Sequence, residues 1–201
     1  MRRMPSKLSI IIPVLNAAAQ LPATLDSLQV LRQRGHEVLV VDGGSRDGSV
    51  TIARKLADRV ILSGPGRALQ MNAGAESAHH DILLFLHVDS CLPADADVLI
   101  GQALSAAHQV WGHFTLGSSG APVTSRLLET CINLRAVVTG IASGAQAIFV
   151  ERTYFERVGG YDAVPMREAA TLCRKLRRHG QPQRISAKYT VKKLPSPGFR
   201  S

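Results

Sequence analysis

The stretch Leu8–Val14 (LSIIIPV) decides the fold, because apolar and largely β-branched residues follow one another there with Ser9 as the only polar side chain. Such a run is typical of a strand that is covered on both faces, as in a parallel sheet. Residues 37–41 and 81–86 continue the pattern, and apolar residues at helical spacing lie between these runs. The alternation predicts an α/β fold with a mostly parallel, doubly wound sheet and helices on both faces.

The other elements follow from periodicity and from turn residues. Leu21, Leu25 and Leu28 recur at helical spacing, and Gly35 is a suitable end for that helix. Further elements are expected as helices at residues 50–56, 67–78, after Pro93, 127–138 and 166–178, and as strands at residues 60–62, 109–116 and 147–150. Gly159-Gly160 indicates a tight turn, and residues 194–201 a frayed tail.

Length and composition are those of one globular domain. The chain has 201 residues, of which 45% are hydrophobic and 19% charged, so it is long enough to bury a core. The net charge of +9 favours an anionic partner, which is a nucleic acid, a membrane surface or a phosphorylated small molecule. Aromatic residues make up only 4%, which argues against stacking on single-stranded nucleic acid.

Much of the excess positive charge lies late in the chain. Its members are Arg174, Lys175, Arg177, Arg178, Arg184, Lys188, Lys192 and Lys193. A solvated helix face followed by a tail accounts for such a run, and contact with an anionic membrane surface is the better of the functional alternatives.

Cysteine usage and hydropathy indicate a cytoplasmic protein. Cys91, Cys131 and Cys173 are odd in number and lack metal-ligand spacing, so reduced thiols are expected. The apolar run at residues 8–15 is too short for a membrane span, and residues 131–150 are interrupted by polar side chains. We therefore expect a soluble or peripheral protein.

Polar residues directly follow three of the predicted strands. Asn16, Asp42 and Asp89 occupy these positions, and ligands of open parallel sheets bind beyond the carboxyl ends of the strands. A dinucleotide-binding dehydrogenase would need a glycine fingerprint after the first strand, but residues 14–19 contain no glycine. A P-loop is absent from the sequence as well, so the crevice must serve another ligand.

Three ordered motifs resemble those of family 2 glycosyltransferases. They are IIPVLN at residues 11–16, VDGGSRDGS at residues 41–49 and GRALQMNAGA at residues 66–75. The segment LFLHVDS at residues 84–90 is similar to the metal-binding strand end of the family, and GAQAIFV at residues 144–150 with GGY at residues 159–161 is similar to its acceptor-side half. The resemblance spans residues 8–180 and is closest to a bacterial branch of small, soluble-looking members.

The resemblance implies a GT-A fold, Rossmann-like in its first half, that transfers a sugar from a nucleoside diphosphate sugar, with UDP-sugars as the first choice, and inverts the anomeric carbon. It implies one domain over residues 1–201, with a nucleotide-binding half at about 8–108, an acceptor-side half at about 109–180 and a basic, poorly ordered C-terminal tail. The substrate-binding residues that it implies are Pro13, Asn16, Asp42, Gly43, Arg67, Asn72 and Gln146.

The same resemblance implies a Mg²⁺ or Mn²⁺ cofactor. Asp89 matches the second acid of the Asp-x-Asp element, whose carboxylate holds the cation against the diphosphate, and His87 replaces the first acid. Local alternatives remain open: Asp42 as a turn residue, His87 as a structural strand-end residue and Arg67 as a surface residue.

The general base is where the chain departs from the family pattern. Ala169 stands at the usual position of the base and Ala145 at that of a further acid, which leaves Glu168 as the candidate catalytic residue. Adjacent helical residues point about 100° apart, so Glu168 does not inherit the direction of the missing carboxylate. The alternative function is a catalytically impaired protein that binds nucleotide-sugars. A nucleic-acid-binding module rests on charge alone and is not expected.

Overall fold

A computed structural model describes residues 7–105, 109–116, 146–164 and 167–191. Its strands are β1 (Leu8–Val14), β2 (Glu37–Asp42), β3 (Arg59–Leu62), β4 (Ile82–Phe85), β5 (Ser90–Cys91), β6 (Trp111–Leu116), β7 (Ile148–Glu151) and β8 (Gln183–Val191). Its helices are α1 (Leu21–Ser27), α2 (Gln29–Gln33), α3 (Ser49–Leu56), α4 (Arg67–Ser77), α5 (Ala96–Ser105), α7 (Arg152–Arg157) and α8 (Glu168–Leu176).

The strands form one sheet in the order β3-β2-β1-β4-β7-β6-β8-β5. Strands β3, β2, β1 and β4 run parallel, whereas β7 is antiparallel to both β4 and β6. β8 runs parallel to β6, and β5 closes the row antiparallel to β8. The predicted α/β fold with a mostly parallel sheet is confirmed.

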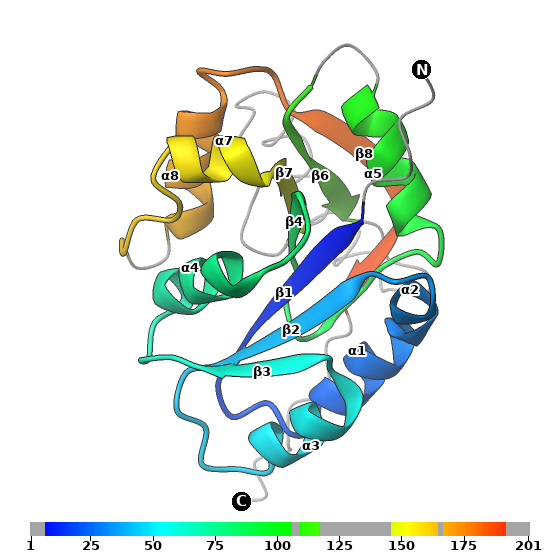
Figure 1. Cartoon of the computed structure of the whole chain (residues 1–201), viewed down its shortest axis with the longest axis vertical. Helices are drawn as coiled ribbons and strands as arrows, with labels where there is room; N and C mark the ends of the chain where they lie inside the picture. Colours follow the sequence, from blue (N-terminus) through cyan, green and yellow to red (C-terminus); the bar gives the residue numbers. More distant parts are fainter. Residues whose placement is uncertain (1–6, 106–108, 117–145, 165–166, 192–201) are drawn as a thin grey trace, which may run out of the picture.

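Helices cover both faces of the sheet, as Figure 1 shows. Alternate strand residues enter two separate cores, because neighbouring side chains of a strand point to opposite faces. Ile10 and Ile12 join the core under α1, α2, α3 and α5, and Ile11 joins the core under α4, α7 and α8. Strand β1 is therefore buried on both of its faces.

Helix α4 lies unusually close to the central strands. A Cβ atom added to Gly74 would stand 2.4 Å from Cγ2 of Ile11 and 3.0 Å from Cγ2 of Val41. Glycine is required at this position because any side chain would push the helix away from the sheet. The close approach fixes the start of α4 near the carboxyl ends of β1 and β2.

Several sequence-based expectations need correction. The helix predicted between Leu21 and Gly35 is broken at Leu28, whose N–H bonds to the carbonyl oxygen of Leu25 only three residues back, so α1 and α2 are separate. Neither α7 nor the short strand β5 was predicted. Arg184 was assigned to a helix face or tail, but it lies in β8, whose pairing is set by β6 and β5 rather than by its own polar sequence.

The helix predicted at residues 127–138 and the tail at 194–201 lie outside the described residues. Within the described ranges, every helix is too short or too polar to cross a bilayer.

Candidate functional site

Asp42 ends β2 and shapes the turn that follows it. Its Oδ2 atom accepts hydrogen bonds of 2.9 Å from the N–H groups of Gly44 and Ser45. The side chain is only 2% exposed, and among the described residues Oδ1 is buried without a hydrogen-bond partner. A buried acceptor is costly when it is left unpaired, so this oxygen is suited to a donor from a ligand.

The loop after β2 is fastened to the loop after β1 by side-chain oxygens. Three consecutive backbone N–H groups are held in this way: Asn16 N–H by Ser45 Oγ at 2.8 Å, Ala17 N–H by Ser49 Oγ at 2.9 Å and Ala18 N–H by Asp47 Oδ2 at 2.9 Å. In return, Asn16 Oδ1 accepts the N–H of Arg46 at 2.8 Å. The two loops therefore form one rigid rim beside Asp42.

Asn16 itself has a left-handed backbone with φ of 50°. Asparagine tolerates this conformation better than most residues. Its side-chain oxygen is engaged by the rim, while the residue as a whole is exposed. Pro13, the other residue assigned to this pocket, pairs with Val41 inside β1 and is half-buried.

A buried amide lies beneath the Asp42 turn. Gln70 of α4 is 4% exposed and donates from Nε2 to the carbonyl oxygens of Val14 at 2.7 Å and Val41 at 2.8 Å. A Cβ atom at Gly43 would come within 3.0 Å of the Gln70 amide. Gly43 is thus needed for close approach, and Gln70 ties the ends of β1 and β2 together.

His87 and Asp89 follow β4, on the other side of β1 from Asp42. His87 Nδ1 and Asp89 Oδ1 are 2.5 Å apart, and both side chains are partly exposed. Burial raises the pKa of Asp89, but the hydrogen bond and the charge of His87 outweigh it, so this pKa lies below its ordinary value. Thr24 Oγ1 bonds to the carbonyl oxygen of Val88, which anchors this loop to α1.

These two side chains are the donors available for a cation. No group of three or more histidine, cysteine, aspartate and glutamate side chains with suitable spacing occurs among the described residues. Mg²⁺ in phosphate-binding enzymes is commonly held by one or two protein ligands, the rest coming from phosphates and water. An imidazole and a carboxylate at the site rim fit such a shared cation, though not one held by the protein alone.

Gln146 and His113 continue the site across the sheet. Extending the β4–β7 register by two residues places buried Gln146 opposite His87. His113 pairs with Ile148 on β7 and is fully buried, and its Nε2 lacks a partner in the described part of the chain. Burial lowers the pKa of His113, which favours the neutral form of its ring.

The α4 residues assigned to substrate differ in their surroundings. Arg67 is the first residue of α4 and is half-buried. Asn72 forms a reciprocal pair with the backbone of Tyr161, with both hydrogen bonds at 2.9 Å. Both polar ends of the Asn72 amide are thus engaged in joining α4 to the Gly159-Gly160 turn.

Asn72 also borders a cavity of about 270 Å³ between α4 and α7. The cavity is lined by Phe155, Glu76 and Glu156 among others, and by none of Asp42, His87 and Asp89. It is therefore separate from the carboxyl ends of β1, β2 and β4.

The predicted base region lies at the start of α8. Glu168 is the first residue of the helix and is half-buried, and its charge acts on the buried Tyr161 hydroxyl, whose pKa is raised mainly by burial. The methyl group of Ala169 packs against the core that contains Phe155 and Leu172. Ala145 lies outside the described residues.

The structure thus brings Pro13, Asn16, Asp42 and Gly43 to one rim, and places His87, Asp89 and Gln146 on the other side of β1. Sequence reasoning missed the fastening roles of Ser45, Asp47 and Ser49, and the buried bridge made by Gln70. Aspartate and serine next to glycines often bond to nearby backbone, which was the available signal for the loop residues. Gln70 gave none, because its partners are distant in sequence.

The fold is shared with solved structures, among them a mannosyltransferase. The mannosyltransferase PcManGT of Pyrobaculum calidifontis, in complex with GDP-Man and Mn²⁺, matches with a TM-score of 0.71 and 20% identity over 98% of this chain and 59% of that chain. Staphylococcus aureus TarS with UDP-GlcNAc matches with a TM-score of 0.72 and 19% identity over 97% and 62%. The protein therefore has a GT-A fold.

The sequence matches the model of Glycosyl transferase family 2 over residues 9–123, which is more than half of the chain. The chain belongs to this family, as its motifs predicted. A PGL/p-HBAD biosynthesis glycosyltransferase of Mycobacterium bovis is 33% identical over 161 residues, which make up 77% of this chain and 62% of the relative. The chain thus spans less than two thirds of that relative.

Proposed function

We propose that the protein is an inverting glycosyltransferase that moves a sugar from a nucleoside diphosphate sugar, most suitably a UDP-sugar, to an acceptor hydroxyl. The observation that carries the proposal is the buried Oδ1 of Asp42 beside the carboxyl ends of β1 and β2, which has no hydrogen-bond partner among the described residues. A base N–H would satisfy it. A nucleotide-sugar donor is supported by two solved structures of similar fold, which contain GDP-Man and UDP-GlcNAc.

The proposed role of each substrate-binding residue follows from its position in the fold. Asp42 would accept a hydrogen bond from the base, with Pro13, Asn16 and Gly43 forming the wall of the nucleoside pocket. The rim made by Asn16 and the loop after β2 would keep this wall in place before the donor arrives, so little ordering is needed on binding. Arg67, Asn72 and Gln146 remain substrate-binding residues by prediction.

We further propose that His87 and Asp89 hold Mg²⁺ or Mn²⁺ together with the diphosphate. When bound, the cation would neutralise the charge that develops on the departing nucleoside diphosphate. The contact between His87 Nδ1 and Asp89 Oδ1 supports a cation shared by these two side chains beyond the end of β4. PcManGT was solved with Mn²⁺, which supports a divalent cation.

Asp89→Ala tests this assignment together with donor binding. We expect UDP in the presence of Mn²⁺ to bind the unmodified protein, and the variant to lose the part of the affinity that depends on Mn²⁺ while it keeps its fold. Calorimetric titration of UDP with and without Mn²⁺ measures the part of the affinity that depends on Mn²⁺ and the part that does not. The control is Asp95→Ala, which replaces an exposed acid just before α5. Unchanged affinity in Asp89→Ala would remove the metal role.

The second candidate function is a nucleotide-sugar-binding protein with impaired turnover. The observation that favours it is Ala169, whose methyl group contacts the core, at the position where the family resemblance implies the general base. Glu168 is the only acid next to it in the chain. A positioned general base contributes about 10²- to 10⁴-fold to a rate.

Ala169→Asp separates the two functions. If turnover is limited by the missing base, the variant should transfer sugar to a sugar or lipid acceptor faster, by up to that range, with donor affinity unchanged. Glu168→Gln is the companion variant, since it abolishes any base activity of Glu168 without altering shape. Ordinary turnover in the unmodified chain with no gain in Ala169→Asp would show that the base lies elsewhere.

We place the protein in the cytoplasm, in peripheral contact with the inner face of an anionic membrane. The support is the net charge of +9, together with the basic residues in the last turn of α8. No role for nucleic acid is proposed.

A further inference from the structure

Exposed arginines lie on α8 and directly before and after it. Leu172, Cys173 and Leu176 are buried and hold the helix against the core. Residues three, four and seven apart lie on the same face of an α-helix. Arg174 lies in α8, and further exposed arginines stand seven residues before it and three and four residues after it, in the positions that flank the helix. We call this set the arginine face, which consists of Arg167, Arg174, Arg177 and Arg178.

Two of the four arginines have no acidic partner among the described residues. Within the part of the chain that the structure describes, Arg174 and Arg178 make no ion pair. The nearby acid Asp162 is engaged by Lys175, with Oδ1 and Nζ 2.5 Å apart. Arg157 on α7, whose guanidinium lies 4.9 Å from the centre of the Tyr154 ring, adds a further cation.

Helix α7 lies beside α8, so this cation belongs to the same flank of the molecule. Figure 1 shows α7 and α8 side by side. The rings of Tyr154 on α7 and His179, three residues after the end of α8, are 5.6 Å apart. The cationic surface therefore extends beyond one helix.

An apolar residue stands at the edge of this face. Val164 is 41% exposed, and its carbonyl oxygen accepts the N–H of Arg167 at 3.1 Å. Among the described residues, none of the exposed large hydrophobic side chains is aromatic, which argues against a surface for stacking bases. Arginines next to a shallow apolar contact suit anionic lipid headgroups instead.

We infer that the arginine face docks on an anionic membrane surface. The inference rests on the peripheral contact of the proposed function and names the surface that makes it. Glu168 begins the same helix, one residue after Arg167. Docking would therefore place the start of α8, where the resemblance puts the acceptor, next to the lipid headgroups.

The test uses the full chain and vesicles. Binding to mixed phosphatidylglycerol and phosphatidylcholine vesicles is compared with binding to pure phosphatidylcholine vesicles by sedimentation. Each arginine near an anionic surface contributes about fivefold, so R174Q/R178Q should weaken binding by about 25-fold. The matched control is R54Q/K55Q, which removes the same charge from exposed residues of α3 on the opposite face of the sheet.

Binding to the anionic vesicles that is lost in R174Q/R178Q and retained in R54Q/K55Q, with both variants folded by thermal unfolding, supports the inference. Equal losses in the two variants would show that net charge alone drives binding and would overturn it. So would the absence of binding by the unmodified chain, or tighter binding of duplex DNA through the same arginines at the same salt concentration. UDP titration of each variant reports separately on the proposed function.

Discussion

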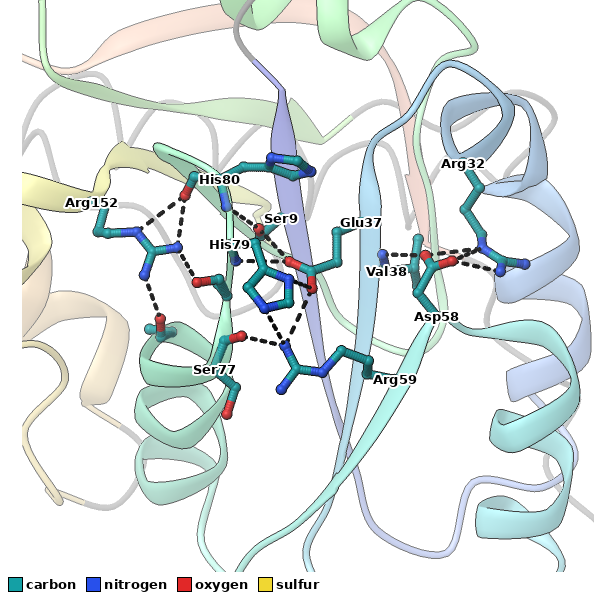
Figure 2. A network of polar contacts seen from close by, with 12 residues as sticks. Ser9, Arg32, Glu37, Val38, Asp58, Arg59, Ser77, His79, His80 and Arg152 are labelled. Carbon is teal, nitrogen blue, oxygen red and sulfur yellow. Dashed lines mark hydrogen bonds and ion pairs between the residues drawn. The ribbon is translucent and has the colours of Figure 1, made fainter.

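The two ends of β2 each carry a buried carboxylate, but the two carboxylates differ in how many of their oxygens are hydrogen-bonded. Glu37 at the amino end is 7% exposed and Asp42 at the carboxyl end is 2% exposed. Glu37 accepts the Ser9 hydroxyl at 2.8 Å and the His79 N–H at 3.0 Å, and it pairs with the His79 ring at 2.9 Å and Arg59 at 3.4 Å. Figure 2 shows this network, in which both Glu37 oxygens are used. At Asp42 only one oxygen is used within the described structure.

Glu37 is therefore a carboxylate whose contacts hold the fold together, whereas Asp42 keeps one oxygen that has no hydrogen-bond partner among the described residues. Around Glu37, Arg152 bonds to the carbonyl oxygen of His80, and the His80 N–H donates to Ser9 at 3.1 Å, so β1, β2 and the start of β4 are tied at one edge (Figure 2). An unpaired buried acceptor costs about 1–3 kcal/mol. The buried acceptor of Asp42 lies at the edge of the sheet where parallel sheets bind ligands.

Replacing Glu37 should have the largest effect. Glu37→Ala removes the acceptor of the buried Ser9 hydroxyl and of the His79 N–H, and a buried polar group left without its partner costs about 1–3 kcal/mol for each group. We expect a loss of that size in the free energy of unfolding, measured by urea denaturation. UDP affinity of the folded protein should not change.

Glu76→Ala, an exposed carboxylate on α4, is the matched control for this experiment and should be nearly silent. A Glu37→Ala protein as stable as the unmodified one would remove the contrast between the two ends of β2.

Asp42→Asn should affect binding rather than stability. The amide oxygen can still accept the N–H groups of Gly44 and Ser45, while the other position changes from an acceptor to a donor. A hydrogen bond to a charged group is worth about 1.5–3 kcal/mol, so UDP affinity should fall about 10- to 100-fold, with or without Mn²⁺.

The Tm of Asp42→Asn should shift by less than about 2 °C, which corresponds to roughly half a kcal/mol for a chain of this size. A large loss of stability with unchanged UDP affinity would make Asp42 a second structural carboxylate. Loss of affinity only when Mn²⁺ is present would instead place Asp42 at the cation.

A smaller, pH-dependent effect should distinguish Glu37 further. Burial raises the pKa of Glu37, but the His79 N–H, the Ser9 hydroxyl, the His79 charge and Arg59 together hold it below its ordinary value. A carboxyl whose pKa is lower in the folded state stabilises fully above its unfolded pKa of about 4.3, and this stability is lost as the pH falls through the folded value.

The stability difference between the unmodified protein and Glu37→Gln should therefore be constant near neutral pH and shrink below about pH 4.3. Urea denaturation over this pH range measures the difference. A gap that stays constant down to the acid limit would mean that the Glu37 charge does not contribute.

Much of the fold follows from local patterns. Leu8–Val14 was predicted to its observed bounds, because an uninterrupted apolar run has no other stable place than the centre of a sheet. β8 could not be predicted in the same way. Of its described side chains Ile185 is buried, while Arg184 and Ser186 are exposed, and the strand exists because β6 lies beside it.

The sequence predicted where the candidate site residues lie in the fold better than it predicted their hydrogen-bond partners. Asp42 and Asp89 were placed at strand ends from the sequence, since every parallel strand delivers its next residue to the same edge. The engagement of Asn72 with Tyr161 could not be foreseen, because these residues are 89 positions apart in the chain. Its substrate-binding role remains a prediction.

The sequence by itself determined the order of elements, the carboxylates at the strand ends and membership of the family, since these depend on local periodicity and on motifs. Only the tertiary structure decided that Glu37 is fully paired and that Asp42 keeps one oxygen without a partner in the described structure. Both are acids at the ends of the same strand, and their difference arises from residues brought in by β1, β3 and the segment before β4. Hydrogen bonds depend on distance in space, which the sequence does not contain.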